Sequence, residues 1–198
     1  MTIRVTVEAE EEIYTYEPAD NGAGPLWCHG STIVVRTGDR VYVAGLETIA
    51  DEVPLNNTRW LLYERQDGGA WRLVHRDTTG RTREPSPIAL VGGQLLVSAN
   101  PSLAEPGAYN GPAAPAVFRF DTSAIDATPR IEQPDWEDGA NFSEHSYRTF
   151  AADGSTGDVL YMQNEGYEIA HMSLRRAGTW QRRGQIRWPY GEEYAKPQ

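Results

Sequence analysis

Ser31-Thr-Ile-Val-Val-Arg-Thr-Gly-Asp-Arg-Val-Tyr-Val-Ala-Gly45 contains two short apolar runs separated by a Gly-Asp turn. The same order, a serine, an apolar run, a glycine-containing turn and a second apolar run, returns at Ser86–Asn100 and at Ser146–Asn164. Apolar runs that flank a glycine turn predict a β-hairpin. A repeated all-β unit of this size is typical of the blades of a β-propeller. The sequence therefore predicts an all-β chain whose functional loops gather at one end of a central axis.

Each copy of the repeat extends to four predicted strands. The blades are expected at residues 31–76, 86–132 and 146–187. The predicted strands are 32–36, 41–45, 59–64 and 71–75 in the first blade, 88–91, 95–99, 116–120 and 130–132 in the second, and 147–151, 159–163, 169–175 and 180–186 in the third. A further strand is expected at residues 3–7, and residues 188–198 are expected to enter another blade. The Pro- and Ala-rich segment 101–115 is expected to be an irregular loop.

Three blades do not close a ring, because propellers have four to eight. The chain is then either a partial β-propeller cut from a longer protein or a unit that closes its ring by association. The sequence favours the fragment. An arc of three blades leaves apolar sheet faces at both ends, so we expect the isolated chain to associate with itself.

Charge and composition exclude several kinds of partner. The 198 residues carry a formal net charge of −10, so binding to nucleic acid through neutralised phosphates is not expected. No stretch has the length of a membrane span, and the N-terminus lacks the apolar core of a secretory signal. As written, the chain is expected to be cytoplasmic. Its single cysteine, Cys28, excludes an internal disulfide.

One turn links the repeat to a known superfamily. Glu64-Arg-Gln-Asp-Gly-Gly-Ala-Trp71 resembles a degenerate Asp-box, the turn of the sialidase-like (BNR/Asp-box) superfamily, and Arg176-Ala-Gly-Thr-Trp180 holds the equivalent place in the third blade. Around Leu26–Ser31 the chain is also similar to uncharacterised bacterial sialidase-like proteins and to propeller enzymes that cleave rhamnose–glucuronate linkages. The resemblance spans about residues 25–188. It implies a propeller that acts on an acidic glycan, with a histidine near the axis transferring the proton.

The order of strands in a blade predicts where the chemistry lies. Loops before the first strand and after the second strand of each blade share one end of the molecule, whereas the hairpin turns share the other. His29 lies before the first blade, and histidine is the usual proton-transfer group near neutral pH. We expect His29 to be the general acid or base, with a packed loop histidine as the alternative.

Further polar residues are predicted at the same end. A carboxylate beside a histidine can tune its proton affinity, arginines can hold a substrate carboxylate, and a tyrosine can stack on a sugar or transfer a proton. The remaining catalytic candidates are Glu84, Glu144, His145 and Tyr109. The substrate-binding candidates are Arg59, Arg83, Arg148, Asn100, Asn164 and Glu47. For the charged residues the alternatives are surface ion pairs, turn caps and solvent exposure, and for Tyr167 we favour packing within a blade.

The sequence therefore predicts a sialidase-like propeller that cleaves a uronate- or sialate-containing oligosaccharide or polysaccharide by hydrolysis or elimination. A glycan- or protein-binding propeller without turnover is the competing hypothesis, and a structural segment without a ligand is a third. No cofactor is expected, because phosphate loops, nucleotide fingerprints and zinc spacings are missing. A calcium ion on the axis stays open, since carbonyl and carboxylate oxygens could supply its ligands.

Overall fold

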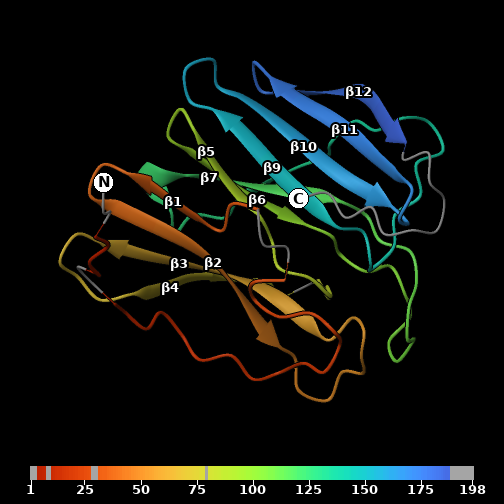
Figure 1. Ribbon diagram of the computed structural model, residues 1–198, viewed down its shortest axis with the longest axis horizontal. Helices are drawn as coiled ribbons and strands as arrows, with labels where there is room; N and C mark the ends of the chain where they lie inside the picture. The colour runs from red at the N-terminus through yellow and green to blue at the C-terminus, as the bar shows by residue number, and fades with distance from the viewer. Residues whose placement is uncertain (1–3, 8–9, 28–30, 79, 188–198) are drawn as a thin grey trace.

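The computed structural model describes residues 4–7, 10–27, 31–78 and 80–187, and these residues form three four-stranded antiparallel sheets (Figure 1). In each sheet the strands pair in chain order. Sheet 1 contains β1 (Val34–Thr37), β2 (Arg40–Thr48), β3 (Thr58–Gln66) and β4 (Arg72–Arg76). Sheet 2 contains β5 (Ile88–Val91), β6 (Gln94–Ala99), β7 (Ala116–Asp121) and β8 (Arg130–Glu132). Sheet 3 contains β9 (Arg148–Asp153), β10 (Asp158–Glu165), β11 (Ile169–Arg176) and β12 (Thr179–Arg187).

Short hairpin turns explain why consecutive strands pair. Val91 pairs with Gln94, so the β5–β6 turn has only two residues, Gly92 and Gly93, and both have positive φ angles of 54° and 76°. Two consecutive residues with positive φ are what a tight turn between right-twisted strands requires, and glycine adopts this conformation without a steric cost. These turns fix the register of each sheet locally.

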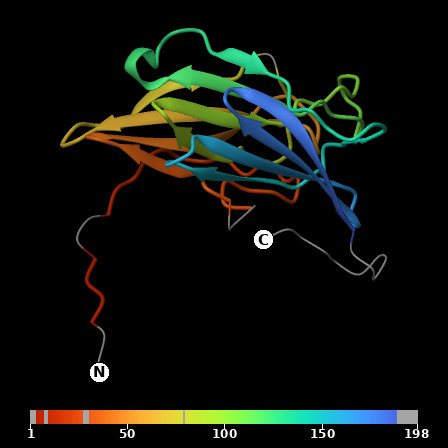
Figure 2. The same cartoon turned by 90° about the horizontal axis from the view of Figure 1, so that it is seen from above.

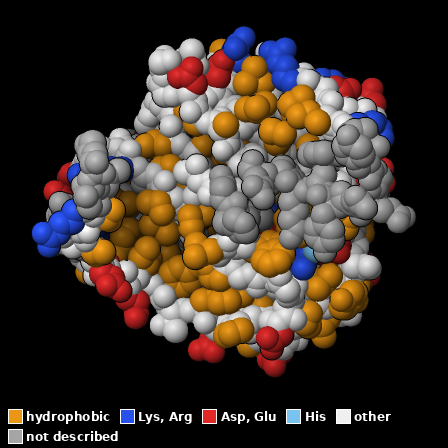
Figure 3. Space-filling view, in the orientation of Figure 1, with side chains coloured by type: hydrophobic (Ala, Val, Ile, Leu, Met, Phe, Trp, Pro, Cys, Tyr) orange, Lys and Arg blue, Asp and Glu red, His pale blue; other side chains and the backbone are white. Residues whose placement is uncertain are grey.

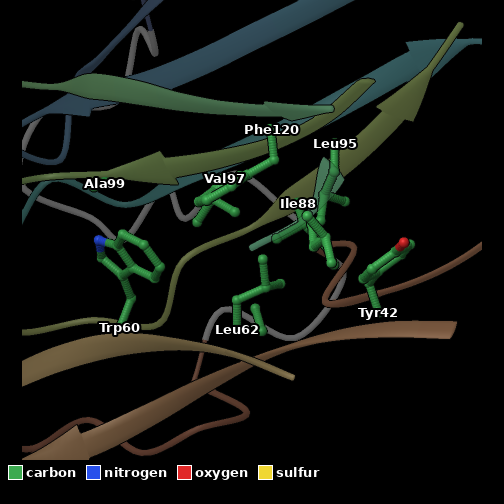
Figure 4. Packing of buried hydrophobic residues seen from close by; sticks show 10 residues of the cluster. Tyr42, Trp60, Leu62, Ile88, Leu95, Val97, Ala99 and Phe120 are labelled. Atoms are coloured by element: carbon green, nitrogen blue, oxygen red, sulfur yellow. The ribbon is translucent and has the colours of Figure 1, made fainter. Parts of the chain in front are cut away.

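Two hydrophobic cores separate the three sheets. The first, between sheets 1 and 2, contains Tyr42, Trp60, Leu62 and Val97 (Figure 4). The second, between sheets 2 and 3, is built from other side chains, which include Ala89, Leu96, Val117, Phe150, Val159, Tyr161 and Trp180. Strand β6 alternates between these cores, and for this reason its sequence is an apolar run rather than an alternating one.

The first strand of each sheet lies next to the first strand of the neighbouring sheet. Near the start of β1, Thr32 accepts a backbone hydrogen bond from Ile88 of β5 at 2.8 Å, and Ser31 Oγ donates to the carbonyl of Arg148 in β9 at 3.1 Å. This arrangement is that of propeller-like blades. The residues described here do not close a ring.

The all-β prediction is confirmed, and the predicted strands match β1–β12 with small differences at their ends. The only helix among the described residues is a short 3₁₀ turn at Thr122–Ala124. The strand expected at residues 3–7 is wrong in its described part: residues 4–7 form no strand, and this exposed segment leads away from the sheets (Figure 2). No neighbouring strand offers it a partner, so its alternating sequence alone does not order it. Residues 188–198 lie outside the described part of the chain.

Candidate functional site

The two ends of the sheets differ in chemistry. At the hairpin end, Asp67 N donates to the Asp39 carbonyl at 2.7 Å, and Thr122 N donates to the Gly93 carbonyl at 2.9 Å, so this end is a network of turns. The charged residues that precede β5 and β9 lie at the opposite end. There the segments before β5 and β9 meet and form a cluster around Arg83.

Arg83 is the centre of this cluster. Its Nη1 lies 3.2 Å from Glu84 Oε1 and hydrogen-bonds the His145 ring, and its Nε donates to the Asn21 carbonyl at 2.8 Å. Asn21 in turn donates to Asn57 Oδ1 at 2.9 Å. The guanidinium therefore ties the loop before β5 to the loop before β9 and to the segment before β1.

Glu84 is a fully buried carboxyl with two arginines nearby. Burial raises its pKa to about 7, against the opposing effect of the charges of Arg148 and Arg83, and the negative charge of Glu144 adds to the increase. A carboxyl that titrates near neutral pH can hold a proton or release it. Glu144 is also buried, and its Oε2 accepts a hydrogen bond from Gly111 N at 3.1 Å.

Aromatic rings lie between this charged cluster and solvent. Tyr147 Oη is 3.0 Å from His145 Nε2, and the two rings meet edge to face at 5.0 Å. The Tyr167 ring lies 5.4 Å from the His145 ring, between centroids, and Tyr167 is 43% exposed. Tyr167 is therefore only partly packed within the blade. Burial raises the pKa of Tyr147 to about 12, as does the nearby Glu84 charge, whereas a hydrogen bond with Trp27 lowers it.

Arg148 lies beneath the cluster at the start of β9. It is 2% exposed, and its Nη2 donates to the Glu84 carbonyl at 3.1 Å. Its Nε and Nη1 have no hydrogen-bond partner among the described residues. The structure therefore buries an arginine with unused donors next to a carboxyl whose pKa is raised.

Asn100 follows β6 of sheet 2 and hydrogen-bonds residues near the cluster. Its Nδ2 donates to the Ser143 carbonyl at 2.8 Å, and its Oδ1 accepts from Gln163 Nε2 at 2.9 Å. Gln163 accepts from Tyr161 Oη at 2.6 Å, and burial raises the pKa of that phenol. Asn164 is buried and its side-chain amide has no partner among the residues described.

Three predicted site residues make other contacts. Arg59 pairs with Glu47 on the neighbouring strand, at 2.5 Å between Nε and Oε2, and Arg76 also approaches Glu47 at 3.2 Å. Tyr109 is 66% exposed in the loop before β7. No contact between these residues and Arg83, Glu84 or His145 is found in the described part of the chain. His29 lies outside the described residues, so its role stays a prediction.

Sequence reasoning missed Tyr147 and Asn21. Tyr147 is two residues from His145, and side chains two apart near a strand point to the same side, so spacing was the available signal. Asn21 has no such signal, because its contact with Arg83 spans 62 residues. Trp136 lies in a loop and packs against Phe142 and Tyr161.

Metal binding finds no support in the described residues, since no group of three or more His, Cys, Asp or Glu side chains among them could hold an ion. No helix in the described part of the chain is long and apolar enough to cross a membrane. No protein-family model matches the sequence, and no curated protein matches it significantly. The site must therefore be interpreted from its own chemistry.

Proposed function

We propose that this chain is a carbohydrate-active, sialidase-like propeller that cleaves an acidic glycan, with its site at the cluster of Arg83, Glu84, His145, Tyr147 and Arg148. The observation that carries the proposal is a continuous path of contacts from solvent to a buried carboxyl. It runs from exposed Tyr167 through His145 and Arg83 to Glu84. Aromatic rings that stack on sugars, a proton-transfer group and guanidinium groups that bind carboxylates occur together along this path.

The His145–Tyr147 pair favours elimination at a uronate over hydrolysis. In this reaction a base removes the proton next to the sugar carboxylate, the bond to the leaving oxygen breaks, a C=C double bond forms, and an acid protonates the leaving oxygen. His145 is suited to accept the first proton once its ring nitrogen releases the hydrogen bond to Tyr147 or Arg83, and the Tyr147 hydroxyl is suited to donate the second. A guanidinium beside the substrate carboxylate would stabilise the charge that develops on it.

The proposal assigns different tasks to the residues at different depths. His145 is partly exposed and can contact a substrate, and Tyr167 can support a sugar ring beside it. Glu84 is fully buried, so it acts through Arg83: the guanidinium stays charged, and the ionisation of Glu84 sets the net charge of the pair. Arg148 contributes positive charge from below.

A binding propeller without turnover is the second candidate, and the burial of the cluster favours it. Arg83 is 6% exposed and Arg148 is 2% exposed, and hydrogen bonds within the protein already engage Arg83 Nε and Nη1 and Arg148 Nη2. Such a network can serve mainly to position the loops. Exposed Tyr167 and the His145 ring would then form the binding surface.

Replacement of His145 by alanine tests the proposal. Turnover of uronate- and sialate-containing oligosaccharides should fall by about 10²-fold or more, the scale of general acid–base catalysis. Affinity should change much less, because proton transfer acts mainly in the transition state. Elimination is followed by the ultraviolet absorbance of the unsaturated product, hydrolysis by new reducing ends, and binding by calorimetry.

Two further variants serve as comparisons. Tyr109→Phe lies outside the cluster and should leave turnover unchanged, whereas His29→Ala tests the residue that the sequence ranked first. If wild-type protein turns over no member of the panel but binds one, the binding module replaces the enzyme. Full activity in His145→Ala together with loss of activity in His29→Ala would transfer the proton-transfer role to His29.

A further inference from the structure

Sheet 1 has one face that no other sheet covers, although the N-terminal segment lies along part of it, where Tyr14 stacks on Tyr63. Val43 pairs with Val34 of β1 and with Tyr63 of β3 on this face, and Val34 is 50% exposed. A groove of about 820 Å³ lies here. Its apolar lining includes Ile13, Tyr14, Leu26, Trp27, Val34 and Val43. Figure 3 shows hydrophobic side chains gathered in this part of the molecule.

Sheet 3 has an equivalent face that no other sheet covers, and its apolar side chains are half-buried. Leu160 pairs with Leu174, and Met162 pairs with Met172, so these four side chains form two apolar cross-strand pairs on one side of the sheet. The residues that alternate with them, such as Tyr161, belong to the second core instead. Ile186 on β12 pairs with Ala170 and is 43% exposed. The open face of sheet 3 is therefore apolar, like the faces that make the two cores.

Both open faces point to the same side of the molecule. β1 and β2 of sheet 1 and β9 and β10 of sheet 3 are seen from one direction, with β5 and β6 of sheet 2 between them (Figure 1). Rotation of a second copy by half a turn about an axis beside these first strands would bring its sheet 3 against sheet 1, and its sheet 1 against sheet 3. Two copies would supply six sheets, a number within the range that closes a propeller ring.

The charges at the borders of the two faces are complementary. Exposed Glu11 and Glu12 line the groove on sheet 1, and Glu11 contacts Arg65 and Trp71 of the same copy. Exposed Arg183 lies on β12, the outer strand of sheet 3, and it pairs with no carboxylate within the described residues. Opposite charges at the border of an apolar contact favour the correct partner and register.

From these observations we infer that the covering partner is a second copy of this chain. The two copies are related by a two-fold axis, so the open face of sheet 1 in each copy contacts the open face of sheet 3 in the other. Such an assembly is closed, so it stops at the dimer and does not continue as a filament. It also removes from water the apolar surface that is still exposed on both faces, such as that of Val34 and Ile186, and burial of apolar surface is the main favourable term in association. The inference does not depend on the proposed catalytic role of His145.

Sedimentation velocity on wild-type chain and on two single variants tests the pairing. Val34→Glu places a charge on the open face of sheet 1, and Met172→Glu places one on the open face of sheet 3. Wild type should be a dimer, and each variant should dissociate at least about tenfold more readily, since a buried unpaired charge is costly. Leu103→Glu, on a loop residue that is 62% exposed, is the matched control and should remain dimeric.

Mixing the two variants distinguishes pairing of sheet 1 with sheet 3 from pairing of a sheet with its own copy. In the inferred dimer, each variant retains the intact face that the other needs, so an equimolar mixture should associate more strongly than either variant alone. Circular dichroism verifies that each variant is folded, and Ile186→Glu replaces Met172→Glu if the latter is unfolded. A monomeric wild type overturns the inference. It is also overturned if only one of the two substitutions, on sheet 1 or on sheet 3, weakens the dimer.

Discussion

At the residue scale, Glu84 makes stability depend on pH in an unusual direction. Its pKa is about 7 in the native protein and 4.5 in an unfolded chain, so between these values the native state holds a proton that the unfolded state releases. The free energy of unfolding must then fall as pH rises through this window. The effect is on the order of 3 kcal/mol, at about 1.4 kcal/mol for each unit of pKa. We expect Glu84→Gln to abolish this decrease, as measured by urea denaturation from about pH 5 to about pH 8.

Glu132 provides a control of opposite sign. Burial raises its pKa, but hydrogen bonds from Arg175 and Trp180 and the charge of Arg175 outweigh burial, so the pKa lies below its usual value. Ionised Glu132 therefore stabilises the native protein at pH values above the pKa of this residue in the unfolded chain, and this stabilisation is lost as pH falls. Glu132→Gln should therefore destabilise the protein mainly above about pH 5, where wild-type Glu132 is ionised. Equal pH profiles for the two variants would contradict the assignment of the neutral-pH proton to Glu84.

At the scale of elements, one glycine lets the N-terminal segment pack on sheet 1. Tyr14 stacks on Tyr63 at 5.1 Å, and both rings lie over Gly45 of β2. A Cβ at Gly45 would come within 3.0 Å of Tyr63 and 3.2 Å of Tyr14. We expect Gly45→Val to destabilise the protein by about 1–3 kcal/mol through overpacking, measured as a lower midpoint of urea unfolding.

The matched substitution is Gly154→Ala, because no atom lies within 4 Å of the added Cβ. It should change stability by no more than about 0.5 kcal/mol, as for other surface substitutions. A Gly45→Val variant as stable as Gly154→Ala would show that the segment with Tyr14 does not pack on the sheet in solution.

The strands could be predicted from sequence because their determinants are local. Apolar runs on either side of turns such as Gly92-Gly93 specify both the pairing and the register of a hairpin. The contact of Arg83 with His145 joins residues 62 positions apart, and it depends on how whole sheets stack. The sequence therefore identified Arg83, Glu84 and His145 as candidates at one end, but it did not predict their burial. It also grouped Arg59 with them, although Arg59 pairs with Glu47 across neighbouring strands.

At the scale of the whole molecule, sheet 2 is shared between two cores. Leu95 and Val97 of β6 pack in the first core, and Leu96, between them in sequence, packs in the second. Loss of order in sheet 2 would therefore remove one wall from both cores at once. Proteins often open in cooperative units that coincide with supersecondary motifs. The shared strand makes the three sheets one unfolding unit.

Leu62→Ala tests this cooperativity from a distance. Leu62 is fully buried in the first core and belongs to sheet 1, so the cavity should cost about 2–5 kcal/mol. We expect the free energy of opening, measured by amide hydrogen exchange, to fall by the same amount in β10 and β11 of sheet 3 as in β2 and β3 of sheet 1. The amounts should be equal because the three sheets must open together. Leu103→Ala, in an exposed loop, should leave both regions unchanged. Faster exchange in sheet 1 with unaltered protection in sheet 3 would mean that the blades unfold separately and that β6 does not couple them.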